Sequence, residues 1–96
     1  MTVDKPQPPL KVYVKVNSDF DSVGFVTPRA IIWKDGRTFK IDAVRDFRPA
    51  STIRPGYSGD CYTVIINGEK RYLFFERSRM IEDTRVGRWW VEIPAS

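Results

Sequence analysis

Ten of the 16 basic residues in this 96-residue chain are arginines, and they are the side chains most able to do chemistry here. The sequence has no histidine, so the commonest general base and the commonest metal ligand are both missing. The one cysteine, Cys61, lies in an apolar run, which is typical of a small core residue rather than a reactive thiol. We therefore expect no enzyme activity, no cofactor and no bound metal.

The arginines gather in two stretches, one at a proline-rich loop and one before the last predicted strand. Arginine forks bind phosphate groups, and nearby aromatic rings can stack on bases. The predicted contacts to nucleic acid or another anionic partner are Arg45, Arg48, Arg54, Tyr57, Arg77, Arg79, Arg85 and Arg88. The alternative is a solvated surface of paired charges, because the net charge is only +4 and acidic residues interleave throughout.

Trp90 is the most informative aromatic residue, because period-two alternation turns it away from the core residue Trp89. An exposed tryptophan is typical of an interface anchor, so Trp90, Phe74 and Tyr72 are a predicted interface. This supports an alternative function as a protein-interaction or accessory subunit, including a homodimer. The other explanation for Trp90 is that it lies under the charged segment 77–85.

Three weaker patterns favour structural roles. Residues 54–59 contain glycines that could cradle a phosphate, but they lack the ending of a P-loop and favour a plain connection. Asp19 and Asp21 could hold Mg²⁺, yet without a third acidic ligand they favour turn chemistry. Glu76 and Glu92 could form an acid–base pair across strands, but strand-end positions favour a solubility role.

The elements that must position these side chains follow a period of two rather than 3.6. The first predicted strand, 10–16, ends in a turn at 17–19, and 23–26 returns before Pro28, which we expect to end the strand or lie on an edge. Segment 77–85 predicts at most one helical turn. The remaining predicted strands are 30–33, 38–44, 61–66, 71–76 and 88–93.

Two hairpins have registers that can be argued from burial. A three-residue loop with Gly36 left-handed pairs Ile31 with Phe39 and gathers apolar side chains on one face. Asn67-Gly68 is a two-residue turn signal, and both faces of its hairpin are apolar. We therefore expect this hairpin to lie centrally or to be covered on its second face.

Short strands with Gly and Pro turns predict an all-β fold, either an SH3-like small antiparallel barrel or a strongly curved sheet of five to six strands. Residues 1–9 are expected to form a flexible lead-in to a single domain, 10–96. With no apolar run of membrane length and no signal-peptide pattern, the sequence predicts a cytoplasmic protein.

The strand and turn motifs also carry a resemblance. Ile31-Ile32-Trp33 with Asp35-Gly36-Arg37, Tyr72-Leu73-Phe74 and Arg88-Trp89-Trp90-Val91-Glu92 give a W-x-D-G-R, Y-L-F and R-W-x-V-E layout. This layout resembles a family of short, uncharacterised bacterial all-β proteins, over roughly residues 10–93. More distantly, the chain is similar to domains of unknown function found near error-prone DNA polymerase genes. The resemblance implies the fold and no activity. From these observations we expect a non-enzymatic binding module.

Overall fold

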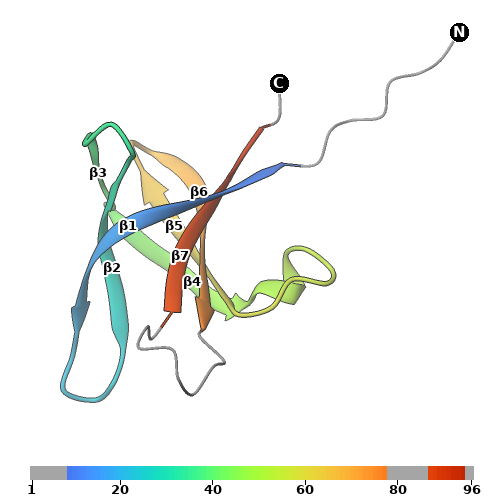
Figure 1. The fold of residues 1–96 in the computed structure, drawn as a ribbon. Helices are drawn as coiled ribbons and strands as arrows, with labels where there is room; N and C mark the ends of the chain where they lie inside the picture. The colour runs from blue at the N-terminus through green and yellow to red at the C-terminus, as the bar shows by residue number, and fades with distance from the viewer. Residues whose placement is uncertain (1–8, 78–86, 95–96) are drawn as a thin grey trace, which may run out of the picture.

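The computed structural model describes residues 9–77 and 87–94, and its strands form one curled antiparallel half-barrel (Figure 1). The sheet has seven strands in the order β3-β2-β1-β7-β6-β5-β4. The all-β prediction is confirmed, with seven strands in place of five or six. The strands are β1 (Leu10–Phe20), β2 (Val26–Ile32), β3 (Thr38–Lys40), β4 (Ala43–Pro49), β5 (Asp60–Ile66), β6 (Glu69–Arg77) and β7 (Gly87–Ile93).

Strand β1 is longer than predicted and joins the two halves of the sheet. Its first half, 10–14, pairs with β7, and its second half, 15–20, pairs with β2. The predicted turn at 17–19 is wrong, because the backbone pairing with β2 holds these polar residues in the strand. The chain turns at 21–25 instead, where the Asp21 carboxylate accepts hydrogen bonds from the backbone N–H groups of Val23 and Phe25.

Pro28 is buried inside β2, so the prediction that it ends the strand is wrong. β3 pairs with Ala30–Ile32 and does not reach Pro28, which therefore pairs on the β1 side alone, as the edge alternative expected. The register shifts here, with Asn17 opposite Ala30 and Ser18 opposite Pro28. Arg29 is the extra residue of this bulge, and a bulge is where a sheet tolerates a residue without an N–H.

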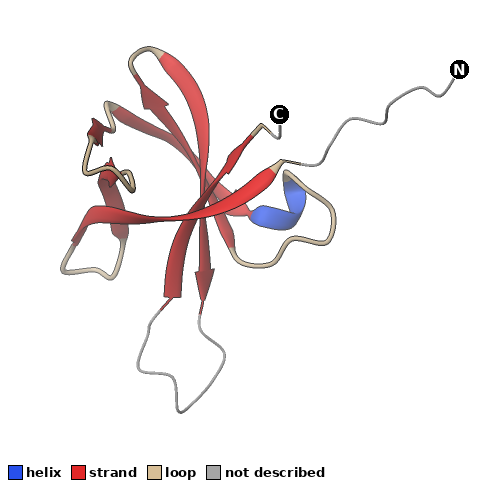
Figure 2. Cartoon of the chain, turned by 45° about the horizontal axis from the view of Figure 1, so that its top comes forward, coloured by secondary structure: helices blue, strands red, loops and turns tan. Residues whose placement is uncertain are grey.

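The predicted strand 38–44 is divided at Ile41 and Asp42. The Ile41 N–H donates to Arg29 of β2 over 2.9 Å, whereas the Asp42 N–H donates to Ile65 of β5 over 2.8 Å. Within two residues the chain therefore passes from one end of the sheet to the other, and β3 and β4 become its two edge strands. This crossing curls the sheet into a half-barrel (Figure 2).

Both predicted hairpin registers are confirmed. Ile31 pairs with Phe39 across a loop in which Gly36 has φ +89°. Ile66 pairs with Glu69 across Asn67-Gly68, both of which have positive φ, as the two-residue hairpin turn requires.

The concave face of the half-barrel holds the main core, which is built on Ile31, Ile41, Val64 and Leu73. A second cluster, Ala50, Cys61, Phe74 and Trp90, lies on the opposite side of β5–β7, as alternation along the strands requires. The loop between β4 and β5, which includes a 3₁₀ helix at Ala50–Thr52, covers this second cluster. The β5–β6 hairpin is therefore buried on both faces, and its second face is covered by a segment that was expected to be a plain loop.

Candidate functional site

Most of the predicted anion-binding arginines are already paired with carboxylates. Arg48 bonds to Asp46, Arg77 lies 3.5 Å from Asp60, and Arg88 lies 3.0 Å from Glu76. Arg45 is exposed on β4, whereas Arg79 and Arg85 fall outside the described residues. These pairs favour the alternative that the arginines form a solvated surface of paired charges.

Arg54 and Tyr57 meet at one acceptor, Glu92 of β7. The Arg54 Nε lies 3.3 Å and the Tyr57 hydroxyl 3.1 Å from Glu92 Oε2. Burial, followed by this hydrogen bond, raises the pKa of Tyr57. The loop between β4 and β5 is thus joined to β7, and Tyr57 covers the second cluster, which contains Phe74 and Trp90.

A second carboxylate acceptor, Glu76 of β6, lies opposite Arg88 at the beginning of β7. It accepts hydrogen bonds from Lys11 Nζ at 2.9 Å, from the Tyr13 hydroxyl at 3.0 Å and from Arg88 at 3.0 Å. The Lys11 hydrogen bond, with support from Tyr13 and Arg88 and against a smaller effect of burial, holds the pKa of Glu76 below its usual value of 4.5. Glu76 and Glu92 thus each have their own donors, and they do not form an acid–base pair.

The predicted exposed interface of Trp90, Phe74 and Tyr72 is wrong as an open surface. Trp90 is 3% exposed and Phe74 is fully buried, with their rings stacked at 4.2 Å. Tyr57 closes over both rings, at 5.3 Å from Trp90 and 5.8 Å from Phe74. The outward direction predicted for Trp90 is correct, and residues 50–57 supply a cover for it. The predicted alternative cover, 77–85, lies outside the described residues apart from Arg77.

The remaining candidates have structural roles. Asp21 caps its own turn and Asp19 pairs with Arg29 at 2.7 Å, so neither points to a metal. Across residues 9–77 and 87–94, no group of three or more Cys, Asp or Glu side chains lies together as metal ligands would. Burial raises the pKa of Cys61 to about 11, which keeps the thiol protonated and unreactive at neutral pH.

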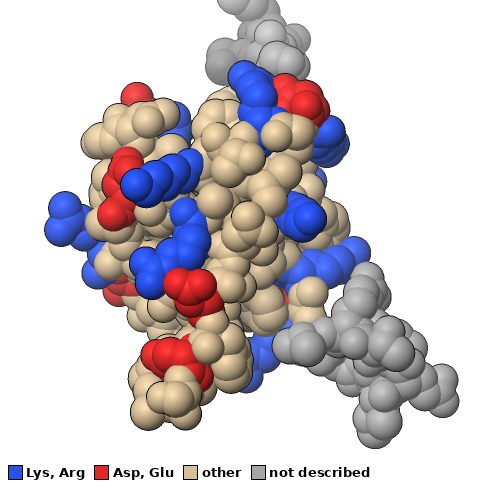
Figure 3. Space-filling model, turned by 90° about the vertical axis from the view of Figure 1, so that its left-hand side faces the viewer, with Lys and Arg blue, Asp and Glu red and all other residues tan. Residues whose placement is uncertain are grey.

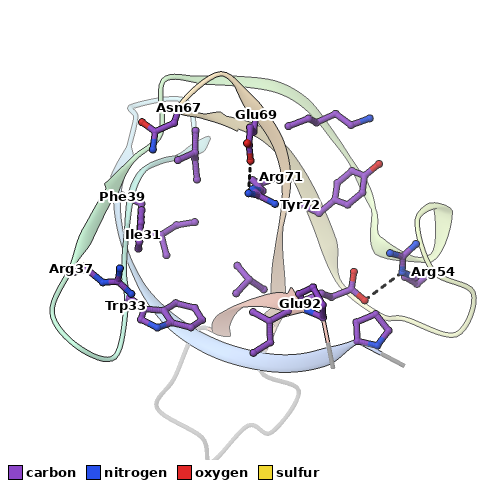
Figure 4. A pocket seen from close by; sticks show the side chains of 16 residues that line it. Ile31, Trp33, Arg37, Phe39, Arg54, Asn67, Glu69, Arg71, Tyr72 and Glu92 are labelled. Carbon is purple, nitrogen blue, oxygen red and sulfur yellow. Dashed lines mark hydrogen bonds and ion pairs between the residues drawn. The ribbon is translucent and has the colours of Figure 1, made fainter. Parts of the chain in front are cut away.

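The concavity that could hold a partner lies elsewhere, at the open end of the half-barrel, and we call it the mouth. It has a volume of about 950 Å³ and opens onto the concave core (Figure 4). Its apolar wall consists of Ile31, Trp33, Phe39, Ile66, Val91 and Ile93. A cavity of this size and lining is typical of a binding site.

The mouth exists because β6 and β7 separate. Their pairing begins at Arg77 and Gly87 and stops at Phe74 and Trp90. Beyond that point residues 69–72 and 91–93 line the opening without pairing with each other. Each of these segments still pairs with its other neighbour, β5 or β1, so each presents one unpaired strand edge to the mouth.

The rim of the mouth is mixed in charge with a basic excess. Its four basic side chains, Arg37, Arg54, Lys70 and Arg71, outnumber the two acidic ones, Glu69 and Glu92, which leaves a net charge of +2. Arg71 bonds to Glu69, and Arg54 bonds to Glu92 (Figure 4). Arg37 bonds over 2.6 Å to Asp35, which lies outside the lining, so three of the four basic side chains already have a carboxylate partner. On the face shown in Figure 3, basic and acidic side chains also alternate, without one broad patch of either sign.

Of the predicted contact and interface residues in the described chain, only Arg54 and Tyr72 line the mouth. Arg77 and Arg88 lie at the far end of the β6–β7 pair, so these two members of the second arginine group do not line the mouth. The sequence analysis missed Arg37 and Arg71. Each lies close to a predicted hairpin turn, but only the tertiary structure shows that both turns border one cavity.

The chain matches no protein-family model, no curated protein and no solved structure. Within the described part of the chain, no helix has both the length and the hydropathy needed to cross a bilayer.

Proposed function

We propose that this protein is a non-enzymatic protein-interaction module whose mouth receives a polypeptide segment with apolar side chains and negative charge. The observation that carries the proposal is the combination of an apolar cavity of about 950 Å³ with a rim of net charge +2. Apolar side chains supply most of the free energy of such contacts, and the rim charges orient the partner.

The two unpaired strand edges favour a polypeptide as the partner. Backbone groups along 69–73 and 91–93 have no partner across the opening. An extended chain can hydrogen-bond to such an edge while alternate side chains enter neighbouring pockets. The interior wall, with Trp33 and Phe39, offers those side chains an apolar surface.

Nucleic acid is the competing partner, and the charges argue against it. A polyphosphate needs several basic side chains that are free to neutralise it. At the mouth, Glu69 and Glu92 stand beside the arginines and already bond to Arg71 and Arg54. A segment with a few carboxylates is repelled less by these two glutamates than a continuous chain of phosphates.

The test is an NMR titration of the folded protein with two probes, a peptide of alternating Phe and Asp residues and an oligothymidylate. We expect the peptide to shift the Trp33 indole and the backbone amides of Arg71 and Val91, whereas the oligonucleotide leaves them unchanged. Arg71→Glu should weaken peptide binding. Arg45→Glu makes the same charge change on exposed β4, outside the mouth, and should not.

Two outcomes contradict the proposal. Oligonucleotide binding that falls steeply with salt, without peptide binding, favours the nucleic-acid function. If the peptide changes the chemical shifts of residues all over the surface, the mouth is not the site. The same conclusion follows if Arg45→Glu and Arg71→Glu weaken peptide binding equally.

A further inference from the structure

The turn between β1 and β2 carries the most exposed large apolar side chains of the described chain, and we call residues 20–25 the tip. Phe20 is 74% exposed, Val23 is 76% exposed and Phe25 is 69% exposed. Single exposed apolar residues are ordinary, but three of them within six residues form an apolar cluster of the kind that marks an interaction site.

The tip is held in one conformation by its own backbone. The Asp21 carboxylate accepts from Val23 N at 3.0 Å and from Phe25 N at 2.9 Å. The Asp21 N–H donates to the Phe25 carbonyl over 2.9 Å, and Gly24, with φ +96°, donates back to the Asp21 carbonyl over 3.2 Å. A turn fixed in this way has little backbone conformational entropy left to lose on binding.

We propose that the tip of one copy docks into the mouth of a second copy. This inference rests on the proposed function and names the partner of that same site. The tip contains Asp21 and no basic residue, a charge of −1, which is opposite in sign to the net charge of +2 at the mouth. The apolar side chains of the tip likewise match the apolar wall that contains Trp33 and Phe39.

The position of the two surfaces requires a second molecule. The tip lies at the lower end of the half-barrel in Figure 1, whereas the β5–β6 turn beside the mouth lies at the upper end. One copy cannot fill its own mouth with its own tip, so the contact is head-to-tail. Such an interface leaves a free tip and a free mouth in each dimer, and it extends into a chain or closes into a ring.

The association should be weak, because a six-residue turn in one cavity buries less than a standard interface. The test is sedimentation velocity between about 10 µM and 1 mM, where contacts of this size become populated. We expect the wild type to form dimers and larger species as its concentration rises. A tip variant, Phe20→Ser with Phe25→Ser, and a mouth variant, Arg37→Glu with Arg71→Glu, should each stay monomeric.

Mixing the two variants is the decisive step. The tip variant keeps its mouth and the mouth variant keeps its tip, so an equimolar mixture should form a heterodimer that cannot grow further. Phe47→Ser is the matched control, since Phe47 is 55% exposed on β4, outside both surfaces, and it should self-associate like the wild type. Circular dichroism of every variant establishes that it is folded.

The proposal is overturned if the wild type remains monomeric at the highest concentration, if the tip variant still associates, or if the mixture forms no heterodimer. Equal loss of association with Phe47→Ser also overturns it, because general surface stickiness would then explain the result. A monomeric wild type that binds the Phe/Asp peptide at its mouth refutes only the second copy as partner. Failure of both experiments refutes the proposed function as well.

Discussion

Tyr57 donates its hydroxyl to Glu92 over 3.1 Å, and this bond joins the loop above Trp90 to the strand that carries Trp90. The Glu92 side chain is 11% exposed and Tyr57 is half-buried, so the bond is partly shielded from water. We expect Tyr57→Phe to lower the free energy of unfolding by about 1 kcal/mol, the usual net value of such a bond. Urea denaturation followed by tryptophan fluorescence measures the loss.

Glu92→Ala removes the acceptor of the same bond. Because Tyr57→Phe and Glu92→Ala both break this bond, the double variant should lose less stability than the sum of the two single variants. Additive losses would show that the hydroxyl and the carboxylate act independently.

Gly59 and Gly56 give a matched pair in the same loop, because both have φ +88°. A Cβ on Gly56 meets nothing within 4 Å, whereas a Cβ on Gly59 overlaps the carbonyl oxygen of Phe75. Gly56→Ala should therefore lower the free energy of unfolding by about 1–2 kcal/mol, because alanine disfavours this backbone conformation. Gly59→Ala should cost clearly more, because β6 has to shift, and thermal unfolding of the two variants measures the difference. Equal losses would contradict the close approach of Gly59 to β6.

Stability should depend on the ionisation of Glu76. Its pKa in the folded protein is lowered, first by the hydrogen bond from Lys11, so its contribution is complete above the unfolded value near 4.5 and is lost as pH falls through the folded value. At pH 7, Glu76→Gln should cost about 1 kcal/mol or less, because Lys11 and Arg88 are well exposed.

The same variant supplies the control for this effect. As the pH falls below about 4.5, the free energies of unfolding of Glu76→Gln and of the wild type, measured by urea denaturation, should become equal. A difference that stays constant down to acid pH would mean that the carboxylate charge does not contribute.

Cys61 should resist alkylation in the folded protein. Its side chain is fully buried and its pKa is raised to about 11, so at pH 8 well under 1% is thiolate. Iodoacetamide followed by mass spectrometry should find no adduct at pH 8 without denaturant and complete labelling in guanidinium chloride. Rapid labelling of the native protein would show that the loop over Cys61 opens readily.

Local patterns were enough to predict the elements whose geometry is local. The Asn67-Gly68 turn and the left-handed Gly36 determined two hairpin registers, because a turn type and a period of two leave one pairing that buries the apolar side chains. The turn at 17–19 was predicted wrongly. A run of polar residues such as Asn17, Ser18 and Asp19 is typical of a turn, and the local sequence does not show that a partner strand pairs with it. Pairing with β2 extended β1 to Phe20.

The sequence by itself determined an all-β chain, the faces of its strands and the outward direction of Trp90, since each depends on residues close together along the chain. Only the tertiary structure decided that residues 50–57 cover Trp90, that Arg54 meets Glu92 and that β6 and β7 separate beyond Trp90. These features depend on how far the sheet curls and where two strands diverge. Such curvature is set by contacts between residues far apart in sequence, which no local pattern records.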